Sequence, residues 1–244
     1  MKTLLKIEDV LSKSFSYTFK NFTKNIKEGF FTVLLLTIIF NFLYFLINKN
    51  LATPVTYVII FFIMGLIVST IAYKVHREIL LKEFIKNPLI KIFDYINLKY
   101  FFFSSLISLV AISPLILIFT LFQNNINFIY GINIKYLITL LVFSLYFAFR
   151  LLFVLPCASI SLPINFSRIN SSPFKLFLIF ATITLMYVLP TYVIFVLQFN
   201  FLENSENLFK IFKPFFDFIS FYISYFNYLT VFSALSYSFK SSYL

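Results

Sequence analysis

Six stretches of about twenty mostly apolar residues, joined by short connections, constrain the fold of this chain more than any other feature. They cover residues 29–48, 53–73, 100–122, 136–157, 175–199 and 214–238. Each can cross a hydrocarbon core of about 30 Å, because an α-helix rises about 1.5 Å per residue. Within that core every backbone N–H and C=O group must be satisfied, which favours helices. The sequence therefore predicts an all-α, polytopic integral membrane helical bundle.

Composition excludes the main soluble alternatives. Of 244 residues, 61% are hydrophobic and only 12% are charged, which is too little polar surface for a soluble domain of this size. The net charge of +11 does not indicate nucleic acid as a partner, because the basic residues flank apolar spans and no soluble fold would carry such a site. We expect residues 28–244 to form a single six-helix transmembrane domain.

Two segments outside the spans are predicted to lie at the membrane interface. In residues 1–27, apolar side chains recur at helical spacing on one face and lysines on another, which is typical of a basic amphipathic interfacial helix. A solvated arm is the alternative interpretation. The longest connection, 74–99, mixes apolar and charged residues in the same way. Pro88 is expected to divide this interfacial segment into two short helices.

The basic residues predict an orientation. Six precede the first span, six lie in 74–99, two lie between the fourth and fifth spans, and one is in the tail. The opposite side has only Lys49, Lys135, Lys210 and Lys213. The positive-inside rule then places both termini in the cytoplasm. With 38 Phe, 16 Tyr, 3 Gly and no Trp, the chain resembles the product of an AT-rich bacterial genome, which favours a bacterial inner (cytoplasmic) membrane.

Arg150 interrupts the fourth span. An arginine inside the membrane is costly and is by default a functional hypothesis, with Glu78, Glu83 or a lipid phosphate as its partner. The alternative is snorkelling, since Arg150 lies six residues before Pro156, or about 9 Å along a helix.

The other two arginines complete a set of candidate lipid- or ligand-binding residues. Only three of the twenty basic residues are Arg, so we expect each to stand where a planar, five-donor group is needed. The candidates are Arg150, Arg77, His76, Glu78 and Arg168.

His76 and Glu78 admit two readings. They form either an acid–base pair acting on a lipid headgroup or part of a charged collar where the second span meets the cytoplasm. A single His without ligands at suitable spacing predicts no metal site. Glycine-rich phosphate loops and the common serine and zinc hydrolase motifs are absent from the sequence, so we expect no cofactor, no catalytic residues and no enzymatic activity.

Three segments resemble a known family of bacterial membrane proteins. They are Val10-Leu11-Ser12-Lys13-Ser14-Phe15, His76-Arg77-Glu78-Ile79-Leu80-Leu81-Lys82-Glu83 and Arg150-Leu151-Leu152-Phe153-Val154-Leu155-Pro156-Cys157-Ala158. The chain is similar to six-span inner-membrane proteins that resemble the membrane domain of glycerophosphoryl diester phosphodiesterases. The family's Ser-Trp pair and glycine before the fifth span are replaced here by Ser171-Ser172-Pro173-Phe174. The soluble phosphodiesterase part has no counterpart in the chain, so the resemblance implies an all-helical membrane protein without that activity.

These observations lead to two functional hypotheses. The first is a lipid-interacting or membrane-organising accessory protein, with membrane lipids, and in particular anionic phospholipid, as its partner. The second is a small-molecule or lipid transporter that uses Arg150. Pro114, Pro156 and Pro190 favour the second hypothesis because prolines break or kink helices within spans.

Overall fold

The computed structural model describes residues 6–124, 134–164, 172–204 and 206–243. The described residues form helices and connections, without strands. In chain order the helices are α1 (Ile7–Lys20), α2 (Phe22–Asn48), α3 (Pro54–Leu80), η1 (Pro88–Lys91), α4 (Tyr95–Asn124), α5 (Ile134–Leu151), α6 (Val154–Ser159), α7 (Pro173–Asn204) and α8 (Glu206–Tyr243). Six helical stretches are long and apolar enough to cross a membrane, which confirms an all-α, multi-pass bundle.

The N-terminal segment is divided into two helices. α1 ends at Lys20, Asn21 interrupts the helix, and α2 begins at Phe22, ahead of the predicted first span. The side chain of Asn25 donates to the Thr18 carbonyl oxygen at 2.8 Å and so satisfies an acceptor at the end of α1. Residues 22–27 therefore belong to the helix of the first span, and the separate N-terminal helix is shorter than 1–27.

The prediction of two short helices within 74–99 is wrong. α3 continues to Leu80 and α4 begins at Tyr95, so both ends of this segment extend spanning helices. Between them lies only the 3-10 helix η1, which starts at Pro88 and is capped by the Asn87 side chain, an acceptor for the Leu89 N–H. Pro88 begins a short helix because its fixed φ suits a first helical position.

The predicted fourth span is broken near its end. α5 ends at Leu151, a turn follows, and the six-residue helix α6 begins at Val154. Pro156 supplies the cause, because it has no N–H to donate to the carbonyl of Leu152. That carbonyl instead accepts from the Leu155 N–H at 3.1 Å. This bond joins residues three apart, so the chain makes a tighter turn here than in a regular α-helix.

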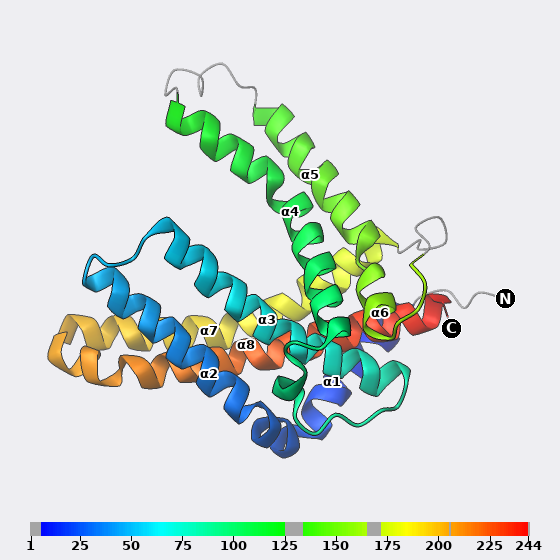
Figure 1. Ribbon diagram of the computed structural model, residues 1–244, viewed down its shortest axis with the longest axis horizontal. Helices are drawn as coiled ribbons and strands as arrows, with labels where there is room; N and C mark the ends of the chain where they lie inside the picture. The colour runs from blue at the N-terminus through cyan, green and yellow to red at the C-terminus, as the bar shows by residue number, and fades with distance from the viewer. Residues whose placement is uncertain (1–5, 125–133, 165–171, 205, 244) are drawn as a thin grey trace.

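Figure 1 shows two groups of long helices. α2, α3, α7 and α8 lie alongside one another, with α1 against the last part of α8. The hairpin of α4 and α5 leans away from them and is joined to the rest mainly through contacts of α4 with α3 and α6, and of α5 with α7. The described parts of the N- and C-terminal regions lie at the same end of the molecule.

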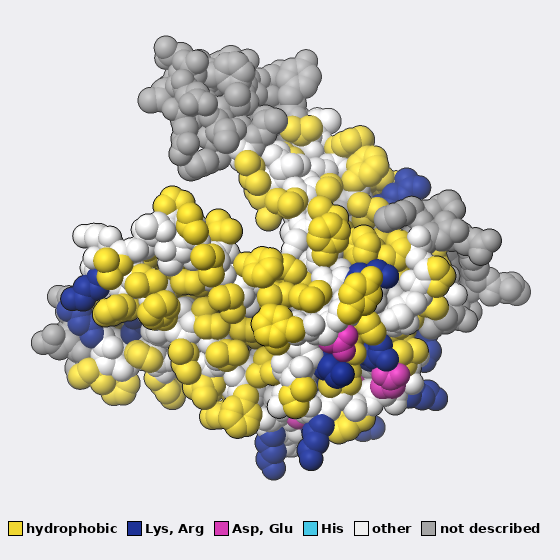
Figure 2. Space-filling view, viewed as in Figure 1, with side chains coloured by type: hydrophobic (Ala, Val, Ile, Leu, Met, Phe, Trp, Pro, Cys, Tyr) yellow, Lys and Arg dark blue, Asp and Glu magenta, His cyan; other side chains and the backbone are white. Residues whose placement is uncertain are grey.

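Two clusters of buried apolar residues hold the groups together. One joins α1, α2, α3, α7 and α8, and the other joins α3, α4, α5, α6, α7 and α8. Large apolar side chains also cover much of the outer surface of the spans, whereas the charged side chains gather towards the two ends (Figure 2). Such an exterior suits contact with lipid chains.

Small residues bring the outer helices close to α8. A Cβ atom added at Gly29 of α2 would lie only 2.5 Å from the ring of Tyr225, so only glycine fits at this contact. On α1, Ser14 and Thr18 are fully buried against α8. The Thr18 and Thr230 hydroxyls are 3.0 Å apart, and Ser233 donates to the Ser14 carbonyl oxygen at 3.5 Å. Seams of this kind stabilise helix pairs by close packing and hydrogen bonds.

Candidate functional site

A groove of about 840 Å³ lies between α3 and α4, where the α4–α5 hairpin diverges from the other helices. Figure 2 shows the surface hollowed between that hairpin and the α2–α3 hairpin. Aromatic residues form much of the wall, among them Phe61 and Phe62 of α3 and Phe101 of α4. Ser104, Ser105 and Ser108 add a polar stripe along α4. The groove is thus mainly apolar with a few polar groups, the usual composition of a ligand site.

Hydrogen bonds fix the polar end of the groove. Ser69, one of its lining residues, donates to the side-chain oxygen of Asn97 at 3.0 Å and to the Leu66 carbonyl oxygen at 2.7 Å. The Asn97 amide donates in turn to the Ile92 carbonyl oxygen at 2.9 Å, which fixes its orientation. Asn97 is fully buried, so these bonds hold the start of α4 against α3.

His76 lies behind the groove and joins three helices. Its Nδ1 is 2.7 Å from the Ser236 hydroxyl of α8, and its Nε2 is 3.3 Å from the Tyr100 hydroxyl of α4. Tyr100 lines the groove, but His76 and Ser236 do not. A Ser–His pair is the chemistry of a nucleophile and its base, yet His76 is fully buried and Ser236 has no exposed surface. The arrangement acts as a structural connection between α3, α4 and α8.

His76 and Glu78 do not form an acid–base pair. Residues two apart on a helix project in nearly opposite directions, about 200° apart. Glu78 accordingly faces α1, where it accepts a hydrogen bond from the Tyr17 hydroxyl. The two side chains that the sequence placed together therefore serve separate contacts.

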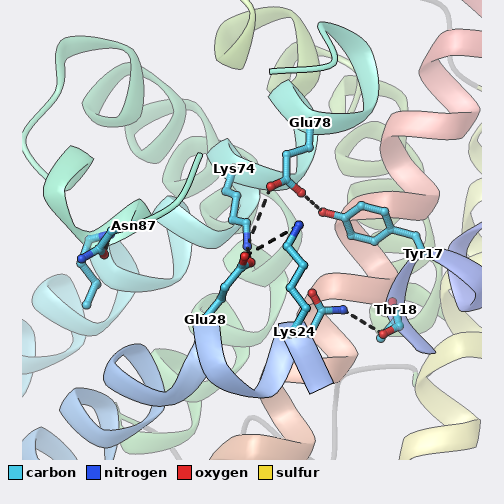
Figure 3. Close-up of polar contacts among 9 residues, drawn as sticks. Tyr17, Thr18, Lys24, Glu28, Lys74, Glu78 and Asn87 are labelled. Atoms are coloured by element: carbon cyan, nitrogen blue, oxygen red, sulfur yellow. Dashed lines mark hydrogen bonds and ion pairs between the residues drawn. The ribbon is translucent and has the colours of Figure 1, made fainter. Parts of the chain in front are cut away.

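Glu78 belongs to a charged cluster formed by α1, α2 and α3 (Figure 3). Its members are Tyr17, Lys24, Glu28, Lys74 and Glu78. Lys74 forms a direct ion pair with Glu28, and its Nζ is 3.9 Å from Glu78 Oε1. The Lys24 Nζ is 3.7 Å from Glu28 Oε1. Two lysines thus face two carboxylates, and the formal charges cancel.

Burial makes this cluster a structural constraint. The Lys74 side chain is only 2% exposed, and a buried ammonium is tolerated only when it is paired. Burial, reinforced by the nearby negative charge of Glu78, raises the pKa of Tyr17 far above its ordinary value. The Tyr17 hydroxyl therefore keeps its proton and remains a donor to the Glu78 carboxylate. This cluster was not predicted from the sequence, in which Lys74 counts only as one of the basic residues that flank the second span.

The candidate arginines that the structure describes, Arg77 and Arg150, do not line the groove. Arg77 binds Glu83 at 2.7 Å and donates to the Ser159 carbonyl oxygen at 3.1 Å, so it caps the end of α6. Arg150 is exposed in the last turn of α5 and does not line the groove. Arg168 lies outside the described residues. Both carboxylates expected to pair with Arg150 have other partners, Glu83 in Arg77 and Glu78 in Tyr17.

Metal binding finds no support in the described part of the chain, where no group of three or more His, Cys, Asp and Glu side chains is placed to hold an ion. Comparison with protein-family models, curated proteins and solved structures found no match to this chain. The fold and the groove define the class, a polytopic all-α membrane protein with a ligand-sized groove between two diverging hairpins.

Proposed function

We propose that this protein is a non-enzymatic, lipid-binding accessory protein of the bacterial inner membrane, and that the groove between α3 and α4 holds a lipid chain. The groove carries this proposal. Its volume of about 840 Å³ lies in the range of about 300–1,000 Å³ that is typical of ligand sites. Its aromatic and aliphatic walls suit an acyl chain.

The position of the groove also favours a lipid over a soluble molecule. Its walls belong to two helices that are apolar enough to span a membrane. Lipid chains are the most abundant apolar molecules at that depth. A bound chain would cover aromatic side chains such as Phe61 and Phe62, which are more than half exposed in the protein alone.

The proposed orientation places both termini in the cytoplasm. It is supported by the excess of Lys and Arg in the segments at the end of the molecule that holds the described terminal regions. The resemblance to six-span inner-membrane proteins supports the same location. Basic side chains at this end would meet the anionic headgroups of the inner leaflet.

Filling the groove tests the proposal. Ser108 is exposed and lines the groove, so Ser108→Phe would occupy part of it. Ser113 is an exposed serine on the same helix that does not line the groove, and Ser113→Phe is the matched control. Lipid retained by the purified protein is measured by native mass spectrometry. We expect Ser108→Phe to lower retention at least tenfold and Ser113→Phe to leave it unchanged.

Equal retention in both variants would refute the groove as the lipid site. The transporter hypothesis predicts a further property, movement of lipid between the leaflets of a reconstituted vesicle. A fluorescent-lipid reduction assay measures that movement. Transfer that depends on Arg150 would support the transporter hypothesis over an accessory role.

A further inference from the structure

A second pocket, of about 430 Å³, lies between the start of α1 and the end of α8. Its polar lining consists of Lys6, which directly precedes α1, Asp9 and Lys13 from α1, and Tyr237, Lys240 and Ser241 from α8. The two helices pack along each other in opposite directions, as the contacts of Thr18 with Thr230 and of Ser14 with Ser233 show. This packing brings together lysines that are more than 220 residues apart in the sequence.

The three lysines of the pocket lack a matching negative charge. Asp9 is its only carboxylate, which leaves a formal excess of two positive charges. In the described part of the chain, no carboxylate lies within 4.0 Å of any of these lysine nitrogens. By contrast, Lys74 and Lys213 are each bound to a carboxylate. Like charges that converge on one pocket repel each other, and an anion bound between them removes that repulsion.

The site lies where a phosphate would be found. Lys240 is in the last turn of α8, which is apolar enough to span the membrane, and α1 flanks this end. Lysines at such an end of a span extend towards the lipid phosphates. The Tyr237 hydroxyl lines the same pocket and is a suitable additional donor to phosphate oxygens, whereas the Ser241 hydroxyl donates to the Ser238 carbonyl oxygen at 2.9 Å.

We propose that Lys6, Lys13 and Lys240 form a binding site for a phosphate group, supplied by the headgroup of an anionic phospholipid or by a soluble phosphate ester. Lysine binds phosphate as a compact point charge, and three lysines from two helices surround it from different directions. The lipid source rests on the proposed lipid-binding function, whereas the phosphate site itself does not. A bound phosphate would fasten α1 to α8 and so tie the N-terminal helix to the last span.

The test compares two triple variants with the same loss of charge. Lys6→Gln/Lys13→Gln/Lys240→Gln removes the site. Lys20→Gln/Lys27→Gln/Lys86→Gln removes three exposed lysines that do not line the pocket. Each protein is reconstituted in nanodiscs of phosphatidylcholine containing one-tenth phosphatidylglycerol, and the phosphatidylglycerol retained after extraction is measured by native mass spectrometry. We expect the amount of retained phosphatidylglycerol to fall at least tenfold in the pocket variant and less than twofold in the control.

A second measurement distinguishes the two sources of phosphate. Inorganic phosphate is titrated against wild-type protein in nanodiscs of phosphatidylcholine alone, and thermal unfolding is followed. Stabilisation that the pocket variant loses assigns the site to a soluble phosphate, whereas retention of phosphatidylglycerol without this stabilisation assigns it to a lipid headgroup.

Equal losses in the two triple variants would overturn the site, because the attraction would then depend on total charge alone. The absence of both phosphate stabilisation and phosphatidylglycerol retention in the wild type would overturn it as well. Neither result bears on the groove, whose lipid retention is tested separately by Ser108→Phe, so failure of this site and failure of the proposed function are distinguishable.

Discussion

Removing the negative charge of Glu28 should destabilise the protein far more than removing an exposed charge nearby. The Lys74 side chain is 2% exposed, and Glu28 is its direct ion-pair partner. In Glu28→Gln the ammonium stays buried, and its remaining partner is Glu78, whose Oε1 is 3.9 Å from Lys74 Nζ. The variant therefore measures how much the protein depends on a fully paired Lys74.

The structure allows the size of the effect to be worked out. At 3.9 Å and an effective dielectric constant of about 20, the attraction between Lys74 and Glu78 is about 4 kcal/mol. That attraction offsets much of the desolvation cost of a buried ammonium, which is several kcal/mol. We therefore expect Glu28→Gln to cost about 3 kcal/mol, the lower end of the range of about 3–5 kcal/mol for breaking a buried pair. Lys74→Met leaves two carboxylates facing each other and should cost about 4–5 kcal/mol.

The free energy of unfolding is measured by reversible denaturation with sodium dodecyl sulfate in mixed micelles. In a double-mutant cycle, Glu28→Gln/Lys74→Met should cost at least about 2 kcal/mol less than the sum of the single variants, because no ammonium is left unpaired. Lys24→Gln is the control, since the Lys24 side chain is 45% exposed and its pair with Glu28 should be worth at most about 1 kcal/mol. Additive single effects, or a Glu28→Gln cost no larger than that of the control, would refute the reasoning.

Three further predictions concern stability. Gly29→Ala should cost about 1–3 kcal/mol in the same denaturation assay, because its Cβ would meet the buried Tyr225 ring at 2.5 Å. Gly65→Ala should cost less, because its Cβ would meet the half-buried Phe101 ring at 2.8 Å with one atom only, the next lying at 3.7 Å; equal costs would contradict this. Because the pKa of Tyr17 is raised, its contribution is fully present below about pH 10 and declines at higher pH. Tyr17→Phe should lower the unfolding free energy at pH 7 by about 1–3 kcal/mol and flatten the decline above pH 10, and an unchanged slope would argue against it. Arg150→Lys should keep the rise in melting temperature that phosphatidylglycerol produces, and Arg150→Leu should reduce that rise; a reduced rise in both variants would indicate a site that needs the guanidinium.

Hydropathy predicted the fold class because a span is a long, local signal. The predicted spans lie within helices, except that the second begins one residue before α3 and the fourth covers most of α5 and part of the short helix α6. The errors arose where charge was taken to end a helix. Lys74 and Glu78 carry charge, yet they continue α3, because Glu28 pairs with Lys74 and Tyr17 donates to Glu78 inside the protein. The sequence shows the i,i+4 spacing of Lys74 and Glu78, but not the helix that faces them.

The site was less predictable because it depends on how helices diverge. A groove between α3 and α4 arises from the lean of the α4–α5 hairpin, which is a tertiary property with no local sequence signal. Ser104, Ser105 and Ser108 lie along the groove, but serines inside a span are equally typical of interhelical hydrogen bonds, so their presence does not predict a groove. His76 stood out in the sequence as the single histidine, but its partners Ser236 and Tyr100 are 160 and 24 residues away.

The seam between α1 and α8 sets an order of events during synthesis. α1 leaves the ribosome first, but Thr18 bonds with Thr230, 212 residues later in the chain. Until α8 has been inserted, the sides of Ser14 and Thr18 that later contact α8 lack those partners. The lysine-rich α1 can lie at the aqueous boundary in the meantime, where water forms hydrogen bonds with these two residues. α8 completes the packing of α1, so in a nascent chain that stops after α7 the N-terminal helix keeps only its contacts with α2, α3 and α7 and should be cut more readily by proteases.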